Sequence, residues 1–209
     1  MILIKDVKRE AIAKLSGKWG VSIGVLVLYI LISMGLSSLT NVIKVYTGST
    51  PLYIVLTILS IIITTLIAFG IINFFVLLSR EEAVAVGDSF YGFKNSSLKA
   101  IGVMILSQIF IFLWTLLLII PGIVAYYKYA FALYILRDNP DMEVTEAIKK
   151  SKELVYGYKG KLLLFQLSFI GWILLCIVTF GIAALWVAPY INTATAVFYN
   201  KLLELKKIS

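Results

Sequence analysis

The sequence contains no histidine and only one cysteine, Cys176. Catalysis by a serine or cysteine that histidine activates is therefore excluded, and so are metal sites with histidine ligands. A disulfide within the chain is excluded too, because it needs two cysteines. The sequence also lacks a glycine-rich phosphate-binding loop. We therefore predict no catalytic residue, no cofactor and no resident metal ion.

Acidic residues are scarce, at 11 against 19 basic residues, and none lies inside a long apolar segment. A carboxylate proton relay within a membrane is therefore excluded. Glu81, Glu82 and Asp88 lie close enough in sequence to suggest a site for a divalent cation. Such a site needs about six or more converging oxygen atoms, so a solvated loop is the simpler interpretation.

Charged residues make up only 14% of the chain, whereas hydrophobic residues make up 61%. Soluble domains average about 25% charged and about 45–50% apolar residues. A soluble protein of 209 residues could not bury this much apolar surface in one core. The composition therefore predicts an integral membrane protein. Its net charge of +8 fits anionic lipid headgroups and the positive-inside rule, so no nucleic-acid partner is predicted.

The apolar segments predict an all-α, polytopic membrane helix bundle that forms a single membrane domain over residues 1–209. Pro121-Gly122 and Phe180-Gly181-Ile182 predict tight outer hairpins, at 121–122 and 180–182. The alternative for residues 121–137 is a re-entrant segment, because the segment is short and carries Lys128. The six predicted transmembrane spans cover residues 20–43, 51–79, 98–120, 121–137, 161–180 and 182–203.

All charged residues except Lys44 and Lys128 fall in four blocks. The blocks are the N-terminus, the loop after the second span, the segment after the fourth span, and the tail with Lys201, Lys206 and Lys207. An even number of spans places all four blocks on one side of the membrane. The positive-inside rule makes that side the cytoplasm, so both termini are predicted to be cytoplasmic.

Two amphipathic cytoplasmic helices are predicted outside the spans. Residues 1–18 combine an apolar stripe with a basic face, which indicates a helix on the membrane surface or a simple topogenic flank. Residues 139–157 begin with a capping Asn139 and a first-turn Pro140, and Gly157 can end the helix. This second helix is expected on the inner membrane surface or against the cytoplasmic ends of the bundle.

Polar residues within the spans indicate a candidate intramembrane site. Lys128 is costly inside a bilayer, at about 2.5–3.5 kcal/mol at its centre, and tyrosines surround it in the sequence. Pro189 frees a backbone carbonyl in the last span, and a kinked polar helix can line a cavity. The alternatives are that Lys128 reaches the outer interface and that the amides and hydroxyls only link helices. The candidate residues are Lys128, Tyr126, Tyr129, Asn192, Thr195, Asn73 and Gln108.

A second candidate site is a basic cytoplasmic face that binds anionic phospholipid headgroups or a membrane partner. Its residues would be Lys5, Lys8, Arg9, Lys149, Lys150 and Lys152. Gly20 and Gly24 form a small-residue motif that fits either close packing within the bundle or a face for a second copy of the chain.

A set of short motifs carries a resemblance to a known family. The motifs are Lys8-Arg9-Glu10-Ala11, Gly17-Lys18-Trp19-Gly20, Pro121-Gly122-Ile123, Asp138-Asn139-Pro140, Glu146-Ala147-Ile148, Leu167-Ser168-Phe169-Ile170-Gly171-Trp172, Gly181-Ile182, Pro189-Tyr190 and Phe198-Tyr199. With them the chain resembles a bacterial family of six-span membrane proteins that is known only as a domain of unknown function. That family is distantly similar to the membrane domain of glycerophosphoryl diester phosphodiesterases, whose catalytic barrel this chain lacks. The resemblance implies a location in the bacterial cytoplasmic membrane. It suggests no particular activity, because the family offers no catalytic or ligand-binding residue to compare.

These observations favour a non-catalytic accessory or regulatory protein that engages lipids or a membrane partner through its basic cytoplasmic face. The first alternative is a small transporter or channel with a polar site around Lys128 and the last span. The second is a lipid-modifying enzyme, which would need polar groups that converge at one headgroup depth.

Overall fold

The computed structural model describes residues 2–206, apart from the side chains of Ile119 and Ile120, so Lys207 of the predicted tail lies outside the described residues. Within this range the fold is all-α, as predicted, and has no strand. Its elements are α1 (Ile4–Leu15), α2 (Trp19–Thr47), α3 (Thr50–Ser79), the short 3-10 helix η1 (Val86–Phe90), α4 (Tyr91–Lys94), α5 (Ser97–Leu117), α6 (Ile119–Tyr129), α7 (Ala132–Asp138), α8 (Val144–Val155), α9 (Lys159–Leu167), α10 (Ile170–Val178) and α11 (Ala184–Lys206).

Four helical segments of the described chain are long and apolar enough to cross a membrane. They are α2, α3, α5 and the segment Lys159–Val178, which α9 and α10 share. The predicted span 121–137 is instead divided between α6 and α7, and the last predicted span lies in α11, which carries Pro189. Asn192, Thr193 and Thr195 make α11 more polar than the other long helices, which explains why the apolar criterion does not select it.

The reversal between α5 and α6 lies at Leu118, which is extended at φ −161° and ψ 144°, rather than at Pro121-Gly122. Pro121 and Gly122 belong to the first turn of α6, where proline is tolerated because its missing N–H has no helical partner. A Cβ atom at Gly122 would clash with Thr115 of α5, so glycine allows the two helices to pack closely. The reversal after α10 uses Phe180 and Gly181, with φ values of 51° and 89°.

The helix predicted at 139–157 begins later, at Val144. Both the backbone N–H and the side-chain amide of Asn139 donate to the carbonyl oxygen of Ile135, at 2.9 and 3.2 Å. Asn139 therefore closes the C-terminus of α7 instead of capping the N-terminus of α8. Gly157, with a φ of 85°, follows the end of α8.

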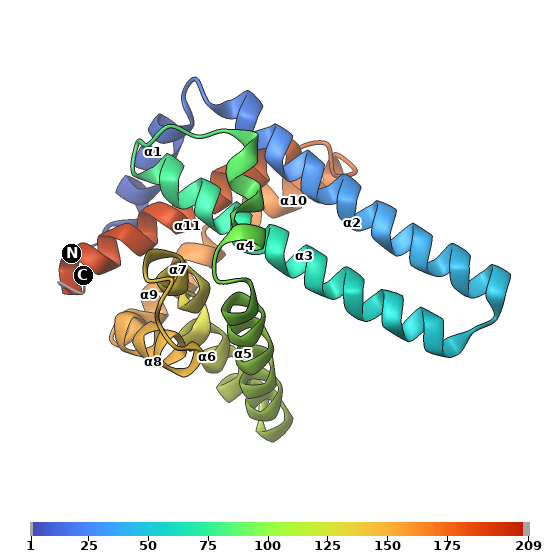
Figure 1. The fold of residues 1–209 in the computed structure, drawn as a ribbon. Helices are drawn as coiled ribbons and strands as arrows, with labels where there is room; N and C mark the ends of the chain where they lie inside the picture. The colour runs from blue at the N-terminus through green and yellow to red at the C-terminus, as the bar shows by residue number, and fades with distance from the viewer. Residues whose placement is uncertain (1, 207–209) are drawn as a thin grey trace.

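The hydrophobic core lies where the helices converge, and the hairpins extend away from it. Figure 1 shows the α2–α3 hairpin reaching out in one direction and the α5–α6 hairpin in another. The buried residues of α3 all lie between Thr65 and Ser79, and no residue of α10 is buried.

Helix α1 packs its apolar stripe against α11, antiparallel to it, so the two described chain ends lie together (Figure 1). Val7, Ala11 and Leu15 are fully buried there. The apolar face that predicted a helix on the membrane surface is therefore covered by the protein itself.

Candidate functional site

The four charge blocks meet at one end of the molecule, where ion pairs and hydrogen bonds join them. Lys14 pairs with Glu81 at 2.7 Å, which links the N-terminus to the loop after α3. Glu10 pairs with Lys201 at 2.7 Å, which links the N-terminus to the tail. Lys206 donates to the carbonyl of Glu153 at 3.1 Å and so ties the tail to α8. We call this part of the molecule the charged end.

A polar network around Asp138 lies at the centre of the charged end. Arg80, at the C-terminus of α3, donates two hydrogen bonds to the Asp138 carboxylate, at 2.9 and 2.7 Å. Arg137 donates a third at 2.8 Å, and the Tyr199 hydroxyl of α11 donates a fourth at 2.8 Å. The network therefore joins α3, α7 and α11 through one carboxylate.

The side chains of this network are largely shielded from solvent. The side chain of Asp138 is 16% exposed, that of Arg137 12% and that of Arg80 30%. Burial alone would raise the pKa of Asp138, but hydrogen bonds from Arg80 and Arg137 outweigh it and hold the pKa below its ordinary value. Asp138 is therefore a carboxylate at neutral pH, and two arginines share it.

Two asparagines complete the network. Asn73 accepts a hydrogen bond from Arg137 Nε at 2.8 Å and donates to the carbonyl of Asp88 at 3.2 Å. Asn200 accepts from Arg80 Nε at 3.2 Å and donates to the Ser79 hydroxyl at 2.8 Å. Asn73, which the sequence suggested for the intramembrane site, thus belongs to the charged end. Sequence reasoning missed the network, although the pair Arg137-Asp138 at the end of an apolar segment was a visible signal.

Five of the seven residues predicted for the intramembrane site line one pocket, and they come from three helices. Gln108 lies on α5, Tyr126 and Tyr129 on α6, and Asn192 and Thr195 on α11. The pocket has a volume of about 390 Å³. We call it the tyrosine pocket, because Tyr134 of α7 also lines it. Its other lining residues include Ser107 of α5 and Gln166 of α9, which sequence reasoning did not single out.

Lys128 does not line the tyrosine pocket. Its ammonium group lies over the ring of Trp114, 5.3 Å from the ring centroid. Its backbone carbonyl accepts a hydrogen bond from Ser151 of α8 at 2.8 Å. This part of α6 therefore lies beside an amphipathic helix of the third charge block, and the lysine and the polar residues of α11 do not meet in one site.

The predicted basic face divides into partly buried and exposed side chains. Lys8 donates to the carbonyl of Ser168 at 2.7 Å and lies 4.2 Å from the ring centroid of Phe169. Lys150 pairs with Glu146 at 3.6 Å. Arg9 pairs with Asp6 at 3.5 Å but stays exposed. The exposed residues of the face are Lys5, Arg9, Lys149 and Lys152.

The structure does not bring Glu81, Glu82 and Asp88 together as a cation site among the described residues. Glu81 pairs with Lys14, and an Asp88 carboxylate oxygen accepts the backbone N–H of Ala85 at 2.7 Å at the start of η1. Glu81 and Asp88 therefore have separate partners, and no group of metal ligands forms in the part of the chain that the structure describes.

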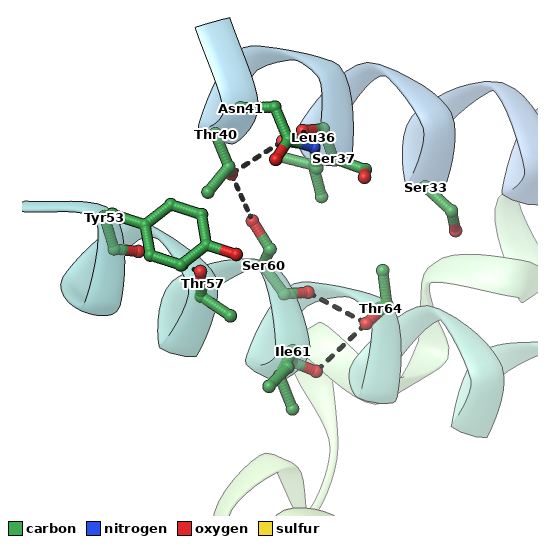
Figure 2. Close-up of a pocket in the computed structure, with 10 residues that line it drawn as sticks. All are labelled: Ser33, Leu36, Ser37, Thr40, Asn41, Tyr53, Thr57, Ser60, Ile61 and Thr64. Carbon is green, nitrogen blue, oxygen red and sulfur yellow. Dashed lines mark hydrogen bonds between the residues drawn. The ribbon is translucent and has the colours of Figure 1, made fainter. Parts of the chain in front are cut away.

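A groove rich in hydroxyl groups lies between α2 and α3, and Figure 2 shows its polar side chains facing each other across the two helices. Thr40 donates to the carbonyl of Leu36 at 2.7 Å, and its hydroxyl lies 3.4 Å from that of Ser60. Thr57 and Thr64 likewise donate to carbonyls of their own helix, both at 2.8 Å. These hydroxyl groups therefore serve the packing of α2 against α3. Their helical spacing in the sequence could have predicted a polar face between the two helices.

Comparison with protein families matches the chain to the family described as "Protein of unknown function (DUF975)", over residues 1–131 and 115–206. The two matches together extend over nearly the whole chain. No curated protein and no solved structure matches the chain. The family description names no activity, so the function has to be argued from the residues of the chain itself.

Proposed function

We propose that this chain, which belongs to the DUF975 family of proteins of unknown function, is a non-catalytic accessory or regulatory protein of the bacterial cytoplasmic membrane. In this proposal it has six spans and two cytoplasmic termini, and it engages anionic lipid headgroups through the basic charged end. The distant similarity to the membrane domain of glycerophosphoryl diester phosphodiesterases stays a prediction.

The meeting of the four charge blocks at one end carries the proposal. Blocks separated by a helical hairpin can contact one another only if the hairpin returns to the side from which it left. Contacts such as Lys14–Glu81 and Arg80–Asp138 therefore support an even number of crossings. The excess of basic residues in the blocks makes the cytoplasm the favoured side.

Six crossings are also compatible with helix length. Residues 119–137, in α6 and α7, would extend about 28 Å at about 1.5 Å per residue, which is close to a hydrocarbon core of about 30 Å. Helix α11 has 23 residues and would extend about 35 Å. The proposed fourth and sixth crossings therefore have the required reach.

Lipid contact through the charged end rests on the basic side chains that remain exposed. Lys149 and Lys152 lie on the outer side of α8, and Lys5 and Arg9 lie on α1. A lysine or arginine near an anionic membrane surface contributes about 1 kcal/mol. The exposed side chains can therefore give a measurable preference for anionic headgroups.

Lipid retention tests the proposal on the full chain in nanodiscs of phosphatidylcholine mixed with phosphatidylglycerol. Native mass spectrometry would measure which lipids stay bound. The double variant Lys149→Gln/Lys152→Gln should lose about 2 kcal/mol of the preference for phosphatidylglycerol. Lys44→Gln is the matched control, because Lys44 lies in the last turn of α2 near the α2–α3 reversal. An unchanged preference in the double variant would contradict lipid engagement through this face.

A further inference from the structure

The tyrosine pocket lies a short distance from the charged end, on its apolar side. On α11, Thr195 and Asn192 precede Asn200, a partner of Arg80, by about 7.5 and 12 Å at 1.5 Å per residue. On α5, Val103 and Ser107 line the pocket and follow Lys99 by about 6 and 12 Å on the same geometry. In the proposed topology the charged end lies at the lipid headgroups. The pocket then lies at the depth where the polar head of a lipid joins its chains.

The pocket offers hydrogen-bonding groups that the protein does not use fully. Ser107 is 9% exposed, and its buried hydroxyl has no hydrogen-bond partner among the described residues. Gln166 accepts from the Tyr127 hydroxyl at 2.9 Å through its oxygen, so its amide nitrogen can donate to a ligand. Asn192 donates to the carbonyl of Ala188 at 2.9 Å, so its oxygen can accept from a ligand. A buried hydroxyl without a partner is costly, and a ligand with hydroxyl groups would remove that cost.

The lining of the pocket carries no charge. None of its lining residues is a lysine, arginine, aspartate or glutamate. A phosphate or carboxylate buried there would lack a counter-charge, which is expensive in an apolar environment. The pocket therefore favours an uncharged head that can both donate and accept hydrogen bonds.

The surroundings provide a place for the apolar part of the ligand. Tyr126, which lines the pocket, is 49% exposed, so the pocket opens to the outside of the described protein. Along α5, Ile105, Ile109 and Phe112 are exposed beyond it. A volume of about 390 Å³ lies within the usual range of ligand sites, about 300–1,000 Å³. The head would occupy the pocket while the chains lie along α5.

We propose that the tyrosine pocket binds the uncharged, hydroxyl-bearing head of a membrane lipid, as in a diacylglycerol or a long-chain alcohol. Gln166 donates to the head, Asn192 accepts from it, and Ser107 gains its missing partner. This site is separate from the basic face, so the pocket can bind its lipid even if the face shows no preference for anionic headgroups.

Photo-crosslinking tests the proposal on the full chain in phosphatidylcholine nanodiscs. Each sample contains one diazirine-bearing probe: a diacylglycerol, a prenol or a phosphatidic acid with the same acyl chains as the diacylglycerol. Peptide mapping should place the diacylglycerol label on pocket residues of α5, α6 and α11, about tenfold above phosphatidic acid. Labelling by the diacylglycerol alone would show that a glycerol head is needed. Labelling by the prenol as well would show that one hydroxyl suffices, and both results support the proposal.

Two variants separate binding from folding. Asn192→Leu keeps the side-chain volume and removes the acceptor, and should reduce diacylglycerol labelling about tenfold. Ser107→Phe fills the pocket and should abolish labelling. Thr57→Val, in the hydroxyl groove between α2 and α3, is the control and should label like the unmodified chain. Equal labelling by phosphatidic acid, or full labelling of Asn192→Leu with an unchanged melting temperature, would overturn the proposal.

Discussion

Asp138 joins three helices through four hydrogen bonds, from Arg80, Arg137 and Tyr199. Removing one member of a buried ion pair leaves the other charge without compensation, which costs more than the pair itself contributes. This residue therefore has a larger effect on stability than any surface acid of the charged end.

Asp138→Asn should lower the free energy of unfolding by about 3 kcal/mol, because two arginines lose their shared carboxylate. Denaturant unfolding in detergent, followed by circular dichroism, measures the change. Asp141→Asn is the matched control, because Asp141 is exposed in the same segment, and it should change stability by about 0.5 kcal/mol or less. Equal effects of the two substitutions would contradict a central role for Asp138.

The same residue predicts a dependence on pH. The pKa of Asp138 is lower in the folded protein than its ordinary value of 3.8. Its contribution is therefore complete above pH 3.8 and is lost as the pH falls through the lower folded-state pKa. The stability difference between the unmodified chain and Asp138→Asn should stay constant near neutral pH and shrink only below pH 3.8. A difference that already shrinks near neutral pH would contradict this assignment.

At the scale of elements, close contacts between helices depend on a few glycines. A Cβ atom at Gly70 of α3 would clash with the backbone of Ser89 in η1, and one at Gly92 would clash with the backbone of Leu66. These contacts hold the loop after α3 against the buried half of that helix. In the same region, Asn73 of the network around Asp138 donates to the carbonyl of Asp88, next to Ser89.

Gly70→Ala should destabilise the fold by about 1–3 kcal/mol, because the added methyl group forces backbone to move. Gly35→Ala is the matched control, since Gly35 has no neighbour within 4 Å of an added Cβ atom. Alanine favours a helix over glycine, so the control should be neutral or stabilising by up to about 1 kcal/mol. Melting temperatures in detergent compare the two, and a stabilised Gly70→Ala would contradict the close contact.

At the scale of the whole molecule, the proposed topology places three hairpin reversals opposite the charged end. The reversals lie at residues 48–49, 118 and 179–183. Figure 1 shows the first two extending in different directions from the shared core. The core is therefore built at one end, and in the proposed topology the membrane covers the apolar side chains on the outer halves of the hairpins.

Cysteine labelling tests this topology on a Cys176→Ser background. Ser49→Cys, Leu118→Cys and Ile182→Cys should react with a membrane-impermeant maleimide in intact cells, because they lie at the reversals. Lys149→Cys should react only after permeabilisation. Labelling of Lys149→Cys and Ser49→Cys from the same side would contradict the proposed six crossings.

The sequence by itself determined the all-α class, the helical segments suited to a membrane and the grouping of charge into four blocks, because these depend on composition and on periodicity along one chain. Tertiary structure decided the rest. It assigned Asn139 to the end of α7, moved Asn73 to the charged end, separated Lys128 from the polar face of α11 and covered the apolar face of α1. It also assembled the tyrosine pocket, whose residues come from helices far apart in the sequence. Which helices meet, and at what depth, depends on how their side chains pack, and periodicity within one helix does not contain that information.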